Sequence, residues 1–271
     1  MHLLTGGGHP RNRKQVAATT VVYTFIFMAL SLFWVDIPGP SANGEMVADQ
    51  GKTMYEIITD IHQETERRDL SGYFYALGNH GEEAIDTLLY FLDCEDPVKR
   101  EFAAGQLGRI RDPKAVDPLI SALQDENWRV INSSCNALAE IGDQRAVAPI
   151  IDLVRKLPPH DRSRYYSVLG RLHAKSAWPY LLKGLEDDRW YVRNAALDAL
   201  CEINFEKARS HVYTALDDTD YRVKRKAVFI LLDRKPEDGL VYLNRVVCDT
   251  DFETRFYARQ AIKQIEKEYN H

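Results

Sequence analysis

Apolar residues recur over the C-terminal two thirds of the chain at a fixed interval of 31 residues. One column of large apolar residues runs without an insertion or a deletion: Leu107, Leu138, Leu169, Leu200, Leu231 and Ile262. A column of small residues keeps the same interval and starts one unit earlier: Ala84, Ala115, Ala146, Ala177, Ala208 and Gly239. Columns that share one register identify a repeat protein.

Each unit contains two stretches of helical spacing. In the first full unit, Leu107 and Ile110 belong to one apolar stripe, and Val116 and Leu119 belong to another. Asp112 interrupts the pattern between them as a candidate N-cap, and a proline follows it at the first helical position. Neither helix can bury its stripe alone, so the units must stack. The pattern predicts an all-α fold, an α-solenoid of about six helix-turn-helix repeats, each 31 residues long.

Two segments carry a family resemblance. Residues 187–200 read DDRWYVRNAALDAL, and residues 142–151 read GDQRAVAPII. The first resembles the start, and the second the turn and second helix, of the short bacterial HEAT repeats known from phycobilin lyases. The resemblance covers about residues 82–267 and implies a HEAT-like solenoid. It implies no single function, because repeats of this kind serve many unrelated tasks.

The N-terminal part contains an uncharged stretch over residues 16–35, VAATTVVYTFIFMALSLFWV. A helix of this length, at 1.5 Å per residue, spans the roughly 30 Å hydrocarbon core of a bilayer. The alternative is a secretory signal peptide, whose apolar stretch is usually about 7–15 residues and ends at a small-x-small cleavage site. The predicted organisation is a cytoplasmic N-terminus (1–15), a transmembrane signal-anchor helix (16–35), a flexible linker (36–53) and the HEAT-like solenoid (54–271).

The charges beside this stretch predict its orientation. Arg11, Arg13 and Lys14 precede it, whereas Asp36 and Glu45 follow it. Basic residues favour the cytoplasmic side of a membrane. The prediction is a single-pass protein bound to the lipid bilayer, with its repeats on the periplasmic side. Cleavage of the segment would instead give a secreted or periplasmic protein.

Charge and cysteine content exclude several classes of partner. The 35 lysines and arginines are interspersed among 40 aspartates and glutamates, for a net charge of −5. Nucleic-acid binding requires a concentrated basic face, so no nucleic-acid partner is expected. The four cysteines lie in different units and form no CxxC pair, which gives no metal or disulfide framework.

No catalytic motif is evident in the sequence. HEAT-like deoxyhypusine hydroxylases bind iron through His-Glu dipeptides, and none occurs here. Glycine-rich nucleotide loops and the GxSxG motif are also missing. The sequence therefore predicts no enzyme, no cofactor and no metal. The alternative is an enzyme or enzyme subunit of the bilin-lyase type that handles a small ligand, against which the predicted membrane segment argues.

A basic column accompanies the apolar columns, at Arg100, Arg162, Arg193, Lys224 and Arg255, with Ile131 interrupting it. We expect these cations to bond to acidic turn residues of neighbouring units and to brace the stack, since charges repeated in register are usually structural in a solenoid.

The third unit departs from the pattern. Two prolines replace its usual start, and Tyr165 stands where other units have Ala or Ser, so it should separate the neighbouring helices. Two interpretations stay open: a local bend in the solenoid, or an exposed patch that binds a partner through Arg162, Arg164 and Tyr165.

A second candidate surface follows the second helices, which line the concave side of HEAT-like arrays. One position reads Tyr180, His211 and Tyr242 in successive units, and Lys183 and Arg245 lie one turn on. Aromatic and basic side chains are enriched at protein interfaces, although Tyr180 and Tyr242 could also cover seams between helices. The sequence thus predicts a membrane-anchored, non-catalytic scaffold or assembly factor that binds another protein, a membrane or periplasmic one, along its concave face.

Overall fold

The computed structural model describes residues 52–64 and 67–269. Within these ranges the regular secondary structure is helical, without a strand. The helices are α2 (Met54–Gln63), α3 (Arg67–Asn79), α4 (Ile85–Leu92), α5 (Pro97–Ile110), α6 (Val116–Ala122), α7 (Trp128–Ile141), α8 (Val147–Lys156), α9 (Ser163–Arg171), α10 (Trp178–Gly184), α11 (Trp190–Ala215), α12 (Tyr221–Arg234), α13 (Gly239–Val246) and α14 (Phe252–Tyr269).

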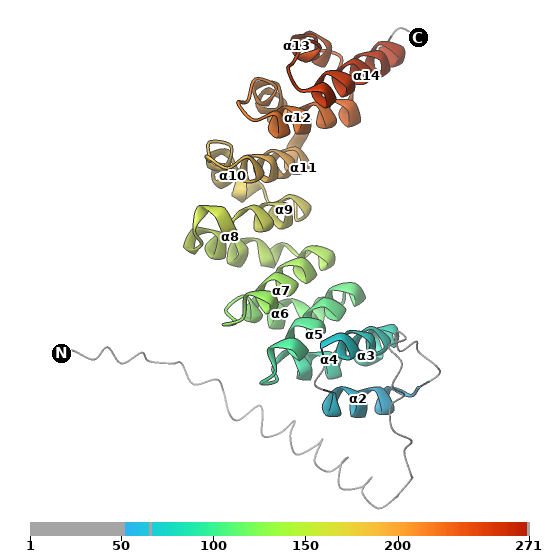
Figure 1. Cartoon of the computed structure of the whole chain (residues 1–271). Helices are drawn as coiled ribbons and strands as arrows, with labels where there is room; N and C mark the ends of the chain where they lie inside the picture. The colour runs from blue at the N-terminus through green and yellow to red at the C-terminus, as the bar shows by residue number, and fades with distance from the viewer. Residues whose placement is uncertain (1–51, 65–66, 270–271) are drawn as a thin grey trace, which may run out of the picture. The chain divides into compact units, whose positions relative to one another are not determined.

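The helices stack in chain order as antiparallel pairs (Figure 1). The second helices α8, α10 and α13 lie on one side of helices α9, α11 and α14. Leu107, Leu138, Leu169, Leu200 and Leu231 are all buried, and so is the column of small residues from Ala84 to Ala208. The predicted all-α solenoid is confirmed, and its two apolar columns form the core.

A left-handed residue ends most of the first helices, at the same register as the repeat. Arg111, Gly142, His173 and Lys235 have positive φ angles of 63°, 79°, 48° and 46°. This conformation ends a helix and turns the chain back, and it favours glycine. The fourth unit has Asn204 at this position in an extended conformation (φ −164°, ψ 99°), and the two helices of that unit follow each other within α11. The tight turn predicted for every unit is therefore reduced to a kink there.

The basic column braces the stack as predicted. Arg193 donates to both carboxylate oxygens of Asp218 (2.8 and 2.7 Å) and to the carbonyls of Asp187 and Asp188 (2.8 and 3.0 Å). Arg100 forms the same arrangement with Asp125, again 25 residues further on. Arg100 and Arg193 thus each join the turn before their own unit to the turn before the next, whereas Arg162 donates to the carbonyl of Leu157.

The first helices pack less closely at the third unit, between α7 and α9. Tyr165 is 5% exposed, and its hydroxyl donates to Asn132 Oδ1 of α7 (2.7 Å). Helix α9 packs closely on α11 but sparsely on α7, whereas α5 packs closely on α7. Between α5 and α7 the backbones approach so closely that a Cβ added to Gly108 would lie only 2.5 Å from the Cα of Ala137. Tyr165 separates its neighbours as expected, and it is no part of an exposed patch.

No helix within the described ranges is long and apolar enough to cross a membrane. The helix predicted over residues 16–35, and nearly all of the linker predicted over residues 36–53, lie outside these ranges.

Candidate functional site

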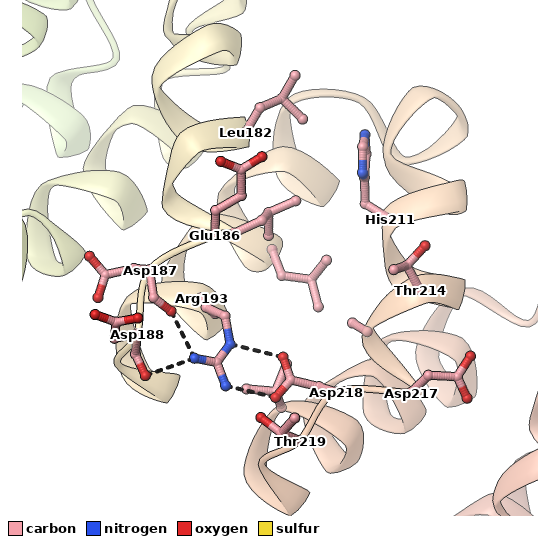
Figure 2. A pocket seen from close by; sticks show the side chains of 14 residues that line it. Leu182, Glu186, Asp187, Asp188, Arg193, His211, Thr214, Asp217, Asp218 and Thr219 are labelled. Atoms are coloured by element: carbon pink, nitrogen blue, oxygen red, sulfur yellow. Dashed lines mark hydrogen bonds and ion pairs between the residues drawn. The ribbon is translucent and has the colours of Figure 1, made fainter.

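A groove of about 750 Å³ opens between α10, the two halves of α11 and the start of α12. Helix α10 contributes Leu182, and the turn after it contributes Leu185 and Glu186. The second half of α11 contributes His211 and Thr214 from the opposite side (Figure 2). The groove therefore lies between the second helices of two successive units, on the face where the sequence predicts a binding surface.

The floor of the groove is apolar and its rim is acidic. Leu197 and Val223 are buried below it, at 0% and 2% exposure. The rim consists of carboxylates and hydroxyls from the two turns between units: Glu186, Asp187, Asp188, Asp217, Asp218 and Thr219. A ligand with a flat apolar body and N–H groups along its edge fits such a lining, because carboxylates accept hydrogen bonds and do not donate them.

Arg193 fixes the two turns that form the acidic rim. Its four hydrogen bonds to Asp187, Asp188 and Asp218 use both Nη atoms and Nε (Figure 2). The bonds to Asp218 raise the pKa of the Arg193 guanidinium, despite the partial burial that opposes them. The cation is therefore held within the wall of the groove, and the exposed charges of the lining are the carboxylates of Glu186, Asp188 and Asp217.

Of the residues predicted to form a binding surface along the second helices, His211 lines the groove. The other residues of that surface lie near it. Arg245 connects to the rim through an ion pair with Asp217 (3.6 Å), and its guanidinium lies 5.0 Å from the ring centre of Tyr242. Tyr242 stacks on Tyr213 with ring centres 3.8 Å apart.

Packing explains part of the aromatic strip. Tyr180 and Tyr242 are half-buried against the core, which agrees with the alternative that they cover seams between helices. Lys183 is exposed on α10, next to the groove-lining Leu182.

The residues predicted in the third unit do not form one exposed patch. Arg162 Nε donates to the carbonyl of Leu157 (3.0 Å), and Tyr165 is buried. Arg164 is exposed, and its guanidinium lies 5.5 Å from the ring centre of Trp128 on α7. Arg164 is therefore the member of this group that is available to a partner.

The thiols of the described units lie outside the groove lining. Burial raises the pKa of Cys135 and of Cys201 to about 12, so both side chains are inert core thiols. Among the described residues, no group of three or more His, Cys, Asp or Glu side chains is placed to hold a metal ion.

Family models identify the repeats. The model of HEAT repeats matches residues 85–164, and the model of a single HEAT repeat matches residues 177–205. The chain contains HEAT repeats. The resemblance noted in the sequence is confirmed, and the groove lies between two of its repeats.

Curated proteins that this chain resembles are named for bilins. The chain is 36% identical over 86 residues to the bilin biosynthesis protein PecE of Nostoc sp., a match that covers 31% of this chain and 34% of that protein. It is 26% identical to the phycocyanobilin lyase subunit alpha of Picosynechococcus sp., over 66% of this chain and 75% of the relative. The matches to the first relatives, PecE of Nostoc sp. and of Mastigocladus laminosus, span about a third of their length, 34% and 32%.

Solved structures share the fold. The complex of CpcE and CpcF of phycocyanin lyase from Nostoc sp. has a TM-score of 0.52 at 19% identity, covering 83% of this chain and all of the matched chain. The E. coli protein YibA has a TM-score of 0.54 at 19% identity, covering 78% and 82%. At these identities the likeness concerns the fold.

These relatives correct three predictions. A non-catalytic scaffold and the absence of enzymatic function are contradicted, because the relatives are named as a lyase subunit and as bilin biosynthesis proteins. The alternative prediction, a bilin-lyase type of subunit, agrees with them. The predicted membrane localisation with periplasmic repeats is also contradicted: it depended on residues 16–35 alone, and neither the relatives' names nor any described helix supports it.

Sequence reasoning found His211 but missed most of the groove. Arg193 was recognised only as a brace, and the Leu182 to Asp188 side was not recognised. The spacing of 25 residues from Arg193 to Asp218 was a usable signal, because it brings the two turns of the rim together.

Proposed function

We propose that this protein is a subunit of a bilin-lyase-type enzyme, and that it binds an open-chain tetrapyrrole in the groove between its third and fourth repeat units. The observation that carries this proposal is the match over 203 residues to a phycocyanobilin lyase subunit, combined with a ligand-sized groove inside the matched type of repeat. A volume of about 750 Å³ falls in the usual range of small-molecule sites.

The chemistry of a bilin suits the lining. Its pyrrole rings are flat and apolar, and they rest on Leu182 and Leu185, which are partly exposed in the groove. Its ring N–H groups donate to Glu186 and Asp217 on the rim. Its two propionate carboxylates are repelled by that rim and pair instead with cations at the margins.

The predicted surface residues then take distinct places. His211 contacts the tetrapyrrole, Lys183 and Arg245 flank it as partners of the propionates, and Tyr180 and Tyr242 support the second helices from below. The protein acts together with a second protein subunit, as the CpcE and CpcF chains of the structural neighbour do.

The test is a spectroscopic titration of the full chain with phycocyanobilin. Thr214 is exposed and lines the groove, so Thr214→Trp should fill the groove and weaken binding at least tenfold. Ser121→Trp is the matched control, because Ser121 has the same register three units earlier and the same hydroxyl bond to the carbonyl four residues before it (3.1 Å in both). Equal binding by the two variants would contradict the groove, and no binding by the unchanged chain would contradict the proposed function.

A further inference from the structure

One edge of the solenoid carries exposed aromatic rings at the repeat interval. The first residue of α7, α11, α12 and α14 is Trp128, Trp190, Tyr221 and Phe252, respectively. Trp128, Tyr221 and Phe252 are 56%, 45% and 69% exposed. Packing against the core does not account for rings this exposed. We call these four residues the aromatic edge.

Guanidinium groups connect the rings of the aromatic edge. The Arg222 Cζ atom lies 4.1 Å from the ring centre of Trp190 and 5.6 Å from that of Tyr221, so it bridges two units. Arg225 lies 5.1 Å from the ring centre of Tyr221 and pairs with Asp251, next to Phe252. The C-terminal half of the edge is therefore a continuous strip of alternating rings and cations.

The arginines of the aromatic edge differ in whether a carboxylate pairs with them. Arg222 pairs with Asp220 (2.7 Å), and Arg225 pairs with Asp251 and Glu253. In contrast, Arg129 and Arg164 lie 5.0 and 5.5 Å from the ring centre of Trp128, and neither forms an ion pair with a carboxylate of the described chain. The end of the edge at Trp128 thus presents two exposed cations to the carboxylates of another protein.

The aromatic edge adjoins the groove. Asp188 and Thr219 line the groove, and each lies two residues before a ring of the edge, Trp190 and Tyr221. A protein bound along this edge would place its own side chains beside the ligand in the groove. An enzyme that joins a bilin to a carrier protein requires such an arrangement.

We infer that the aromatic edge is the docking surface for the protein that receives the bilin, and that this protein offers apolar side chains along the edge and carboxylates to Arg129 and Arg164. The inference rests on the proposed function. Trp, Tyr and Arg dominate the binding energy of protein interfaces, which is the composition of this edge. Charge complementarity at the Trp128 end sets the orientation of the docked protein.

The experiment measures binding of the full chain to apo-phycocyanin, without bilin, by surface plasmon resonance at two salt concentrations. The variant Trp128→Ala/Arg129→Gln/Arg164→Gln should weaken binding at least tenfold and reduce its salt dependence. The matched control is Tyr75→Ala/Arg109→Gln, which removes an equally exposed ring (57%) and the cation 4.4 Å from its centre at another place on the solenoid. The control should bind apo-phycocyanin as the unchanged chain does.

The outcomes separate this inference from the proposed function. If the edge variant binds apo-phycocyanin as tightly as the control, or if the unchanged chain does not bind it, the docking surface is refuted. If sedimentation velocity instead shows that the edge variant loses self-association, the edge joins copies of this chain and the inference is equally refuted. Phycocyanobilin binding by the edge variant should be unchanged, and its titration tests the proposed function independently.

Discussion

Single residues in a left-handed conformation strain the backbone at the turns of this solenoid. Arg111 and Lys235 adopt the left-handed conformation although neither is glycine. In that conformation a Cβ crowds the following carbonyl oxygen, at a cost of about 1–2 kcal/mol. Gly142 shows at the same register the residue that avoids this cost. The position of the turn follows from the sequence, but its strain does not, because only the backbone angle reveals it.

Replacing Arg111 by glycine should therefore stabilise the array. Arg111→Ala keeps the strained Cβ and loses the exposed ion pair with Glu140, so it isolates that loss. The free energy of unfolding of Arg111→Gly should exceed that of Arg111→Ala by roughly 1 kcal/mol, which corresponds to a Tm about 2–4 °C higher for a chain of this size. Differential scanning calorimetry measures both variants. A lower Tm for the glycine variant would show that the turn is not strained.

Acid should weaken the cap of α12 through one carboxylate. The hydrogen bond from the Arg222 guanidinium lowers the pKa of Asp220 from its ordinary 3.8 to about 2. The folded state therefore prefers the ionised form, so this stabilisation is present at neutral pH and is lost as the pH falls from about 5 toward 2.

The substitution Asp220→Asn isolates this effect. Asparagine keeps the N-cap bond, as Asn127 does at the same register in the second full unit. The variant should lose less Tm than the unchanged protein between pH 6 and pH 3. An identical loss of Tm in both proteins would assign the acid sensitivity to other groups.

Whole helices are positioned by devices that the sequence repeats. The apolar columns predicted the pairs of helices and their stacking, because burying a stripe requires a neighbour at a fixed interval. The pairing of column cations with aspartates 25 residues further on also follows from the sequence. Where Ile131 interrupts the basic column, the residue 25 positions on is Lys156, so the cation and its aspartate are both replaced. The groove could not be predicted in this way, since its lining combines two turns with half-buried faces of three helices.

Removing the cation of the Arg193–Asp218 pair should lower the stability of the array, and a second substitution should restore part of it. Arg193→Ile leaves Asp218, which is 14% exposed, without its cation, and should destabilise the array by roughly 3 kcal/mol. Adding Asp218→Asn removes the stranded charge and keeps an oxygen for the N–H of Asp220. The double variant should melt above the single variant. A double variant that melts at or below the single one would show that the pair contributes little through its charges.

At the scale of the whole molecule, the solenoid places the proposed bilin groove next to the aromatic edge. The exposed rings of the edge share the register of the core columns, so they could have been recognised from Trp128, Trp190 and Tyr221 in the sequence alone. Their role depends on what lies beside them, and only the structure brings the turns at Asp188 and Thr219 together around the groove.

Hydrogen–deuterium exchange of the full chain, with and without saturating phycocyanobilin, tests the central claim most directly. It reports both whether the bilin binds and where. We expect slower exchange confined to the two turns and the helix that line the groove, residues 182–189 and 211–220, with α3 to α6 unchanged. Exchange that phycocyanobilin leaves unaltered throughout, or protection that lies only in other repeats, would contradict a bilin site in this groove.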